Sequence, residues 1–474
     1  MIHLNKDLVQ QLEIVNLLSC QTKPLSSKEI SKSIGEITSS TVLNYCKILK
    51  EEIETIYPDN DLRMSIDNQG IFLENRGVTL TKLKNYLLSS DLSYQILYAV
   101  LVQNKVDTYW FCLSHGTSHS TLRRKIGSIN SDISKFGFHI YCANNFFIEG
   151  EEIKLRNFFS IFLWIIHRKF SDIPDISSKN FYLDLADSLL TTNAAFSYEP
   201  ELLSFFLCTT DLRVKNGHII EQTEENDIFL RNYICNKPMA LSYWQESDYT
   251  FMRFSYFSHI LKDPEDLDYL DSFSLSSIED KLIEDWIKCF NQTFGTVSPA
   301  NLDFVRKILK RNIISERMLK ISTNLVPLFV YDDFNIFKKE YKFFCKKFDG
   351  FFRKLNKRYP ELNNEFYRNF CFYICLVVLP PEQIRPKIKV FCLTDYTYIL
   401  NRMFEYTLET KLVNQYILEF SNDPDDADLI ISNLTMPDNL KHELDDRHFL
   451  LLENPFSDQN LDTISKAMTT ISLQ

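Results

Sequence analysis

One spacing of apolar residues occurs twice in the chain, in TVLNYCKIL (41–49) and in TLRRKIGSI (121–129). In each segment a threonine is followed by apolar residues one, five and eight positions later. Those offsets place the apolar side chains on one face of a helix, so both segments are expected to be helical and to pack by the same face. Because their surroundings repeat as well, the chain is expected to contain an internally duplicated domain.

The first copy is bounded by clear helix and turn signals. Apolar residues follow a helical period over 8–18, and Pro24 ends that helix. Ser26 and Glu29 have the spacing of a capping box, which predicts the start of a short second helix. After the third helix, an Asp-Asn-Gln-Gly turn within 62–75 joins two β-prone runs and predicts a hairpin.

The second copy repeats this order. A helical pattern covers 91–104, and Asp107 is placed to cap a short helix that follows it. The third helix spans 120–137, and two β-prone runs form a hairpin over 138–150. Helix, short helix, turn, longer helix and hairpin is the order of a winged helix-turn-helix domain. The sequence therefore predicts two such domains in tandem.

The rest of the chain changes character once more. From about 155 to 385 the pattern is almost wholly helical and rich in Phe, Leu and Ile. Pro380 and Pro381 end this stretch, and β and α runs then alternate to the end of the chain. Alternation at this spacing predicts a small α/β domain with a mostly parallel sheet. The expected fold is therefore multidomain and mainly α, with winged helix-turn-helix domains first and an α/β domain last.

Composition limits the chemistry that the chain can perform. Only 10 of 474 residues are glycine, and neither a GxGxxG nor a GxxxxGK phosphate-binding pattern occurs. The 11 cysteines form no CxxC pair and do not cluster with histidine at ligand spacing, so neither a metal nor another cofactor is expected. The first residues lack a secretory signal, and the longest apolar runs are far short of a bilayer span. A cytoplasmic protein without a membrane partner is expected.

The net charge of -11 is not spread evenly along the chain. Residues 1–150 hold 15 basic and 15 acidic side chains, so the whole acidic excess lies after them. An acidic chain ordinarily argues against nucleic acid as a partner, because phosphate binders present basic surface. The neutral first part removes that objection for the two predicted helix-turn-helix domains.

Three local segments add a family resemblance: IEGEEIKLRNFF at 148–159, LRVKNGHII at 212–220 and FNQTFG at 290–295. Together with the order of the elements, they resemble the Mga/AtxA family of virulence and global transcription regulators of Gram-positive bacteria. The resemblance implies two PTS-regulation domains in the helical middle and an end similar to the IIB component of sugar phosphotransferase systems. The domains so expected are a first winged helix-turn-helix domain at 1–80, a second, Mga-type one at 81–154, PTS-regulation-like domains at 155–312 and 313–384, and a IIB-like α/β domain at 385–474.

The resemblance implies a DNA-binding transcription regulator rather than an enzyme. It also implies a dimer or larger homo-oligomer formed through the IIB-like domain. An RNA-binding antiterminator with PTS-regulation domains is the alternative. Two helix-turn-helix patterns oppose it, since that class binds RNA with a small β domain. A phosphotransferase enzyme is a third reading, and it is opposed because the loop 394–397, after the first C-terminal strand, has neither Cys nor Gly.

A recognition helix docks by its apolar face and turns its polar face to base edges and phosphates. In the second copy, arginine can hold guanine bidentately and the neighbouring lysine suits a phosphate. A basic triplet alone is more often solvated surface, but its place in the repeated pattern favours DNA. The side chains expected to face DNA are Ser39, Ser40, Thr41, Asn44, Tyr45 and Lys47 in the first copy and Ser118, His119, Ser120, Arg123, Arg124 and Lys125 in the second.

PTS-regulation domains are controlled by phosphorylation of histidine, which adds charge at a domain interface. The resemblance thus implies proteins of the phosphotransferase system as further partners. No histidine occurs between residues 260 and 441, so the second regulatory domain has no such site. His218, in the Gly-His stretch, and His167 remain as candidate phosphorylation sites. His167 lies in an aromatic-rich helical segment and is the more typical of a structural histidine.

Overall fold

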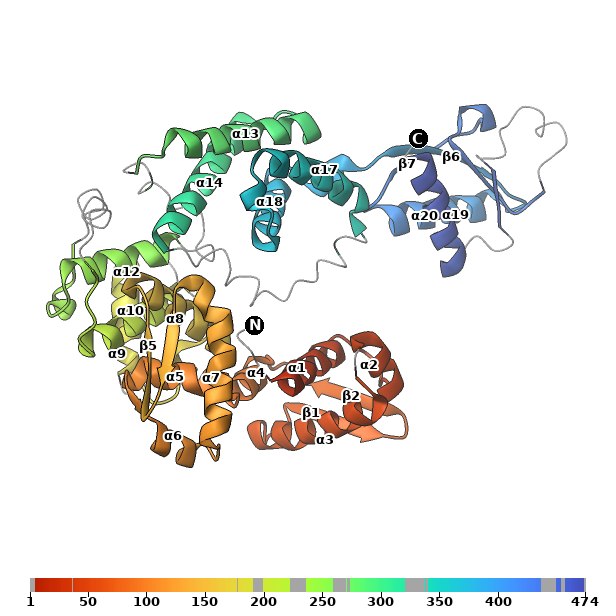
Figure 1. The fold of residues 1–474 in the computed structure, drawn as a ribbon. Helices are drawn as coiled ribbons and strands as arrows, with labels where there is room; N and C mark the ends of the chain where they lie inside the picture. Colours follow the sequence, from red (N-terminus) through yellow and green to blue (C-terminus); the bar gives the residue numbers. More distant parts are fainter. Residues whose placement is uncertain are drawn as a thin grey trace. The chain divides into compact units, whose positions relative to one another are not determined.

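The computed structural model describes residues 5–35, 37–176, 178–190, 199–221, 236–258, 270, 273–319, 337, 340–435, 449–452 and 457–472. Over these residues the chain is mainly helical, with β-strands near its two ends (Figure 1). Its internal contacts divide it into two compact units, 1–275 with 310–329 and 276–309 with 330–474. The expectation of a multidomain, mainly α fold is confirmed.

The first winged domain (residues 5–80) contains the expected elements α1 (Lys6–Ser19), α2 (Ser27–Ile34), α3 (Ser39–Ile56), β1 (Leu62–Asp67) and β2 (Gly70–Asn75). Ser26 and Glu29 form the predicted capping box, in which Glu29 Oε2 accepts the Ser26 backbone N–H at 2.7 Å. β1 and β2 pair antiparallel, and Leu25 forms a bridge with Ile71 beside them. The inward faces of the three helices meet the hairpin in one apolar core.

The second winged domain (residues 91–149) contains α5 (Leu92–Gln103), β3 (Val106–Asp107), α6 (Thr108–Ser114), α7 (His119–Ile133), β4 (His139–Cys142) and β5 (Asn145–Glu149). Its antiparallel sheet has the order β3-β5-β4. Asp107 caps α6 as predicted and accepts the Trp110 N–H at 2.9 Å. β3 takes the place that the Leu25 bridge has in the first winged domain. The two copies therefore share a third strand position that the sequence analysis did not predict.

A further helix that the sequence analysis did not predict, α4 (Thr81–Ser89), connects the two winged domains. Leu83 and Leu87 of this helix lie in the core of the first winged domain. Asn85 is also buried, and its Nδ2 donates to the carbonyl of His167 at 3.0 Å. α4 is thus a packed connector rather than a solvent-exposed linker.

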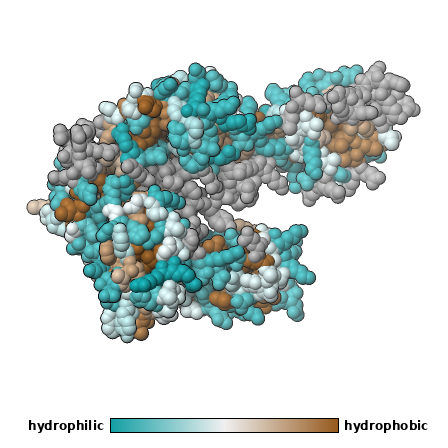
Figure 2. Space-filling view, viewed as in Figure 1, coloured by the Kyte–Doolittle hydropathy of each residue, from teal (hydrophilic) through white to brown (hydrophobic). Residues whose placement is uncertain are grey.

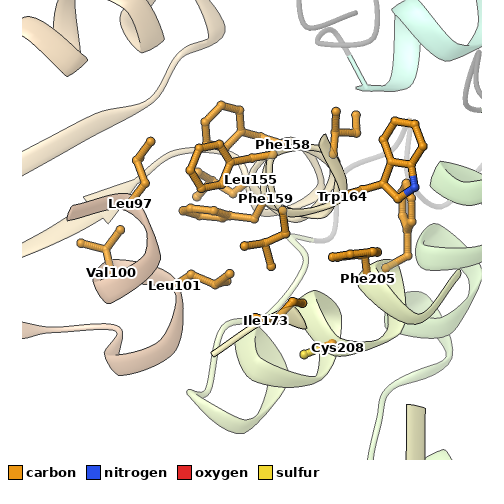
Figure 3. Close-up of a cluster of buried hydrophobic side chains, with 14 of the residues drawn as sticks. Leu97, Val100, Leu101, Leu155, Phe158, Phe159, Trp164, Ile173, Phe205 and Cys208 are labelled. Atoms are coloured by element: carbon orange, nitrogen blue, oxygen red, sulfur yellow. The ribbon is translucent and has the colours of Figure 1, made fainter. Parts of the chain in front are cut away.

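The helices after the second winged domain continue its hydrophobic core. They are α8 (Glu152–His167), α9 (Lys179–Leu189), α10 (Glu199–Lys215) and α12 (Glu246–Ser258). α8 is buried along nearly its whole length because α10 and α12 pack on it and α4 contacts it. Figure 3 shows Leu97 and Val100 of α5, Phe158 of α8 and Phe205 of α10 within this single core. The boundary expected at residue 154 therefore falls inside α8 and inside a continuous core.

The second unit contains α13 (Ser277–Phe294), α17 (Lys342–Arg358) and α18 (Glu365–Val378), which pack in that order. Aromatic side chains fill their contacts, and the ring centroids of Trp286 and Phe351 are 5.1 Å apart. A domain boundary is predicted at residue 312, but that residue lies inside α14 (Pro299–Leu319). α13, which precedes α14, packs with α17, which follows it. The apolar face of α13 packs against the aromatic face of α17. Helical periodicity predicts each apolar face but not which two helices pack together.

The C-terminal part is the expected α/β domain, with β6 (Lys387–Leu393), α19 (Tyr398–Leu412), β7 (Ile417–Phe420), β8 (Leu429–Ser432), β9 (Phe449–Leu451) and α20 (Asp458–Ile471). Its four strands are parallel, in the order β7-β6-β8-β9. Single 3₁₀ turns complete the described structure: η1 (Ser134–Phe136), η2 (Phe170–Asp172), η3 (Met239–Leu241), η6 (Pro360–Leu362), η7 (Pro381–Ile384) and η8 (Pro424–Asp426). Within the described ranges, no helix combines the length and apolar character needed to cross a bilayer.

Candidate nucleic-acid interface

The two predicted recognition helices, α3 and α7, begin with the same cluster of hydroxyl groups. Oγ1 of Thr38 caps α3 and accepts the Thr41 N–H at 3.2 Å, and Oγ of Ser118 caps α7 and accepts the Thr121 N–H at 3.1 Å. Each cap oxygen also lies within 2.8 or 2.9 Å of the serine hydroxyl two residues on. Neither helix has an acidic residue in its first turn. The positive end of each helix dipole is therefore available to an anion such as a phosphate.

The outer face of α7 is polar and basic. Of the residues predicted to face DNA, Ser118, His119, Ser120, Arg123 and Arg124 are exposed. The inner face consists of the predicted apolar residues Leu122, Ile126 and Ile129, together with Ile133, and all four are buried. This arrangement allows the helix to dock on its own domain while it turns two adjacent arginines outward. Each guanidinium can hold a guanine edge or a phosphate through two parallel hydrogen bonds.

Lys125, the third basic residue of the cluster, is braced against its own domain. Its side chain is 19% exposed, and Nζ lies 3.8 Å from Oδ1 of Asp91. The same Oδ1 accepts the Ser93 N–H at 2.7 Å and so caps α5, while Oδ2 accepts the Asn5 N–H at 2.9 Å. A phosphate contact by Lys125 would therefore compete with this ion pair. The sequence pattern gives no sign of this role for Asp91, because the residues that meet there are far apart in the chain.

α3 offers a smaller polar face than α7. Of the residues predicted to face DNA, Ser40, Asn44 and Lys47 are exposed and Ser39 and Thr41 are half-buried. Two apolar side chains, Leu43 and Ile48, also reach the surface of this helix. The outer face of α3 therefore carries less positive charge than that of α7, and the two sets of polar residues lie in separate domains.

Tyr45 is predicted to lie on the outer face of α3, and this prediction is wrong. The side chain is buried, and its hydroxyl lies 2.9 Å from Asp7 Oδ1 and 3.3 Å from Gln10 Oε1, both on α1. Position 45 corresponds to Lys125 in the repeat. Both side chains turn toward the start of the first helix of their own domain, so this position serves packing in both copies.

A comparison with known protein families bears directly on this site. Residues 76–163 match the Mga helix-turn-helix domain. The match begins directly after β2, includes the whole second winged domain and ends inside α8. No curated protein matches the chain. The matched residues thus include α7 and its arginines. The match supports the function of a DNA-binding transcription regulator for this domain.

The two candidate phosphorylation sites differ in accessibility. His167 is buried at the end of α8, its Nε2 lies 2.7 Å from Tyr94 Oη, and burial lowers its pKa to about 4. His218 is half-buried after α10, with Nε2 2.7 Å from Asn104 Oδ1. Burial and the charge of Arg213 lower the pKa of His218 as well. His218 is the more accessible of the two imidazoles.

The C-terminal sheet does not present a reactive thiol at the loop after its first strand. That loop, 394–397, carries Asp395 and no cysteine. Cys392 lies within β6, where burial raises the pKa of its thiol to about 12. A thiol with such a pKa remains protonated at neutral pH and is a poor nucleophile. Among the residues that the structure describes, no group of three His, Cys, Asp or Glu side chains could hold a metal ion.

Proposed function

We propose that this chain is a transcription regulator of the Mga type that binds duplex DNA mainly with α7 and to a smaller extent with α3. The observation that carries the proposal is the exposed pair Arg123 and Arg124 on a hydroxyl-capped helix inside the matched domain. The neutral charge of residues 1–150 supports it, because the acidic excess of the chain lies outside the DNA-binding part.

A titration of the full chain with duplex DNA and with hairpin RNA, across a range of salt, tests this function. Binding to the duplex is expected to weaken steeply as salt rises, since bound phosphates release counterions. The double substitution Arg123→Ala and Arg124→Ala should weaken duplex binding by about 1–3 kcal/mol for each base that an arginine holds. The matched control is Lys346→Ala with Lys347→Ala, which removes the same charge from exposed positions of α17.

Two outcomes would contradict the proposal. If the arginine variant bound duplex DNA as tightly as the control variant, α7 would not be the DNA-binding helix. If the chain bound hairpin RNA and not duplex DNA, the RNA-binding antiterminator would be the better description.

We also propose that the chain self-associates through α19 of the C-terminal domain, with a second copy as the partner. This helix exposes Tyr398, Ile399, Met403 and Tyr406, of which Tyr398 is 80% exposed. Figure 2 shows apolar surface over this domain. Aromatic and methionine side chains are typical anchors of protein interfaces, and exposed apolar patches mark interaction sites.

Control by the phosphotransferase system is the last part of the proposal. His218 would receive the phosphoryl group, because it is less buried than His167. Incubation with the phosphorylated phosphocarrier protein of the system, followed by mass spectrometry under conditions that preserve phosphohistidine, tests this. Labelling of His218 is expected, whereas no labelling would remove the phosphotransferase system as a partner.

A further inference from the structure

Asn104, directly after α5, has a backbone conformation that residues other than glycine rarely adopt. Its φ is 63° and its ψ is -60°, and across it the Lys105 N–H donates to the Gln103 carbonyl at 2.7 Å. These features define the γ-turn with positive φ, which is rare and strained. Strain of this kind persists only where the surrounding structure holds it, and it is concentrated at functional and switch sites.

The turn at Asn104 leads directly into the helix-turn-helix of the second winged domain. Val106 begins β3, which pairs with β5, and Asp107 caps α6. α6 in turn packs against α7, the helix that carries the exposed arginines. The conformation of Asn104 therefore determines where β3 and α6 begin relative to α5.

His218 is the side chain that holds Asn104. Its Nε2 lies 2.7 Å from Asn104 Oδ1, and since that oxygen can only accept, Nε2 is the donor. His218 comes from the helical part of the chain, 114 residues further on. One hydrogen bond thus connects the end of α10 with the strained turn of the DNA-binding domain.

His218 is itself firmly placed. Gly217, with a φ of 79°, ends α10, and the His218 N–H donates to the Arg213 carbonyl at 3.1 Å. The carbonyl oxygen of His218 accepts a hydrogen bond from Nη2 of Arg156, at 3.0 Å. Arg156 is buried and pairs with acidic residues of α8 and α12, at 2.8 and 2.6 Å. The position of His218 is therefore fixed by the packing of three helices.

We propose that His218 is a positioning residue for DNA binding: it holds Asn104 in its strained turn and so keeps β3 and α6 in the arrangement that presents α7. The inference rests on the proposed function, because it names the residue through which the helical part acts on that site. A rearrangement of α8, α10 or α12 that withdraws His218 releases the turn. DNA affinity then changes without any contact between His218 and DNA.

Hydrogen exchange of the full chain in the absence of DNA tests the positioning role independently of DNA binding. His218→Ala should speed exchange of the backbone amides in 104–110 several-fold, while the equivalent segment before α2 in the first winged domain keeps its rate. His218→Gln, whose side-chain amide can donate to the same oxygen, should restore much of the protection. Unchanged exchange in His218→Ala, or equal exchange in the Ala and Gln variants, would overturn the proposal.

A DNA titration measures the consequence for binding. Removal of one hydrogen bond in His218→Ala should weaken duplex binding about five- to tenfold. Asn104→Gly, which accepts positive φ and lacks the side chain, should weaken it too, and combining it with His218→Ala should weaken it no further. Additive effects of the two substitutions would overturn the proposal. If the unmodified chain binds no duplex, the proposed function fails, and the exchange experiment alone decides whether His218 holds the turn.

Discussion

Nζ of Lys125 lies 3.8 Å from Oδ1 of Asp91, so α7, the predicted recognition helix of the second winged domain, is tied to the start of α5 by one of its own basic residues. The corresponding pair in the first winged domain is Tyr45 and Asp7, which share a hydrogen bond of 2.9 Å. The same position braces both recognition helices, although the chemistry of the pair differs. Contact with DNA is then expected from the other exposed polar residues of each helix, which include Lys47 on α3 and Arg123 and Arg124 on α7.

Replacing Lys125 by alanine is expected to lower the stability of the fold more than the affinity for DNA. The pair is mostly buried, but Asp91 keeps two backbone N–H donors, so the cost should be about 1 kcal/mol. Urea unfolding should show this decrease for Lys125→Ala and less than about 0.5 kcal/mol for the exposed Arg124→Ala. A DNA titration should rank the two variants in the opposite order. Equal stabilities would argue against a bracing role for Lys125.

Removing Arg123 and Arg124 together is expected to flatten the salt dependence of binding if both reach phosphates. Each phosphate contact contributes about 0.9 to the slope of log affinity against log salt concentration, so the slope should fall by about two. If the arginines hold bases instead, the slope should be kept while discrimination between DNA sequences disappears. Fluorescence anisotropy at four salt concentrations, with specific and scrambled duplexes, separates these results. An unchanged slope with unchanged discrimination would remove both residues from the interface.

Replacement of Arg213 is expected to be among the most destabilising single changes in the helical part. Its Nε and Nη2 donate to Glu152 at 3.0 and 2.6 Å in the core. Burial opposes ionisation of Glu152, but hydrogen bonds and charge from Arg213 and Arg156 hold its pKa below the ordinary value. Arg213→Met should cost about 3–5 kcal/mol in urea unfolding, because it leaves a buried carboxylate with half of its partners. Arg353→Met, at an exposed position of α17, is the control and should be nearly neutral.

His167 is expected to make the stability of the fold depend on pH. Its pKa in the folded chain is about 4, below the ordinary 6.5, so the unfolded chain takes up this proton first as the pH falls. The stability should be constant above about pH 6.5 and should decrease toward pH 4, by about 3 kcal/mol at most. Urea unfolding at several pH values in this window measures it. His167→Gln, which does not titrate, should lack this component, and an identical pH profile for that variant would refute the assignment.

Charge placed on α19 is expected to separate the self-associated chain into smaller species. Ile399 and Tyr406 are each 70% exposed, so Ile399→Asp with Tyr406→Asp should disturb an interface without disturbing the core. Light scattering after gel filtration should show the lower mass. Ile278→Asp, at an exposed position of α13, is the control and should leave the mass unchanged. If the α19 variant kept the mass of the unmodified chain, association would have to use another surface.

The sequence predicts those structural elements that depend on interactions between residues close together in the chain. The apolar positions of α7, the capping box at Ser26 and the cap at Asp107 all depend on residues within one or two turns, and all three predictions are confirmed. α4 was missed because it is short and has no side-chain cap, and its helical state depends on the burial of Leu83 and Leu87 in a core formed by other elements.

In the candidate site as well, some residue positions follow from the local sequence pattern and others depend on contacts between distant residues. That Arg123 and Arg124 lie on the outer face of α7 follows from helical period alone. Tyr45 stands at the edge of the apolar face of α3, and only its long-range contact with Asp7 decides that it is buried. Asn104 is a residue type that tolerates positive φ, but no local pattern reveals its contact with His218, which lies 114 positions further along the chain.

The uninterrupted hydrophobic core that joins the second winged domain to α8, α10 and α12 also limits how such a protein can be divided. A cut at residue 154 would remove α8 and expose the apolar surface of α5 that packs in the same core. Proteolysis, domain exchange between related chains and gradual shortening of the helical part would all leave this DNA-binding domain without much of its interior. The helical part and the second winged domain share one interior and are therefore expected to fold and unfold as a single unit.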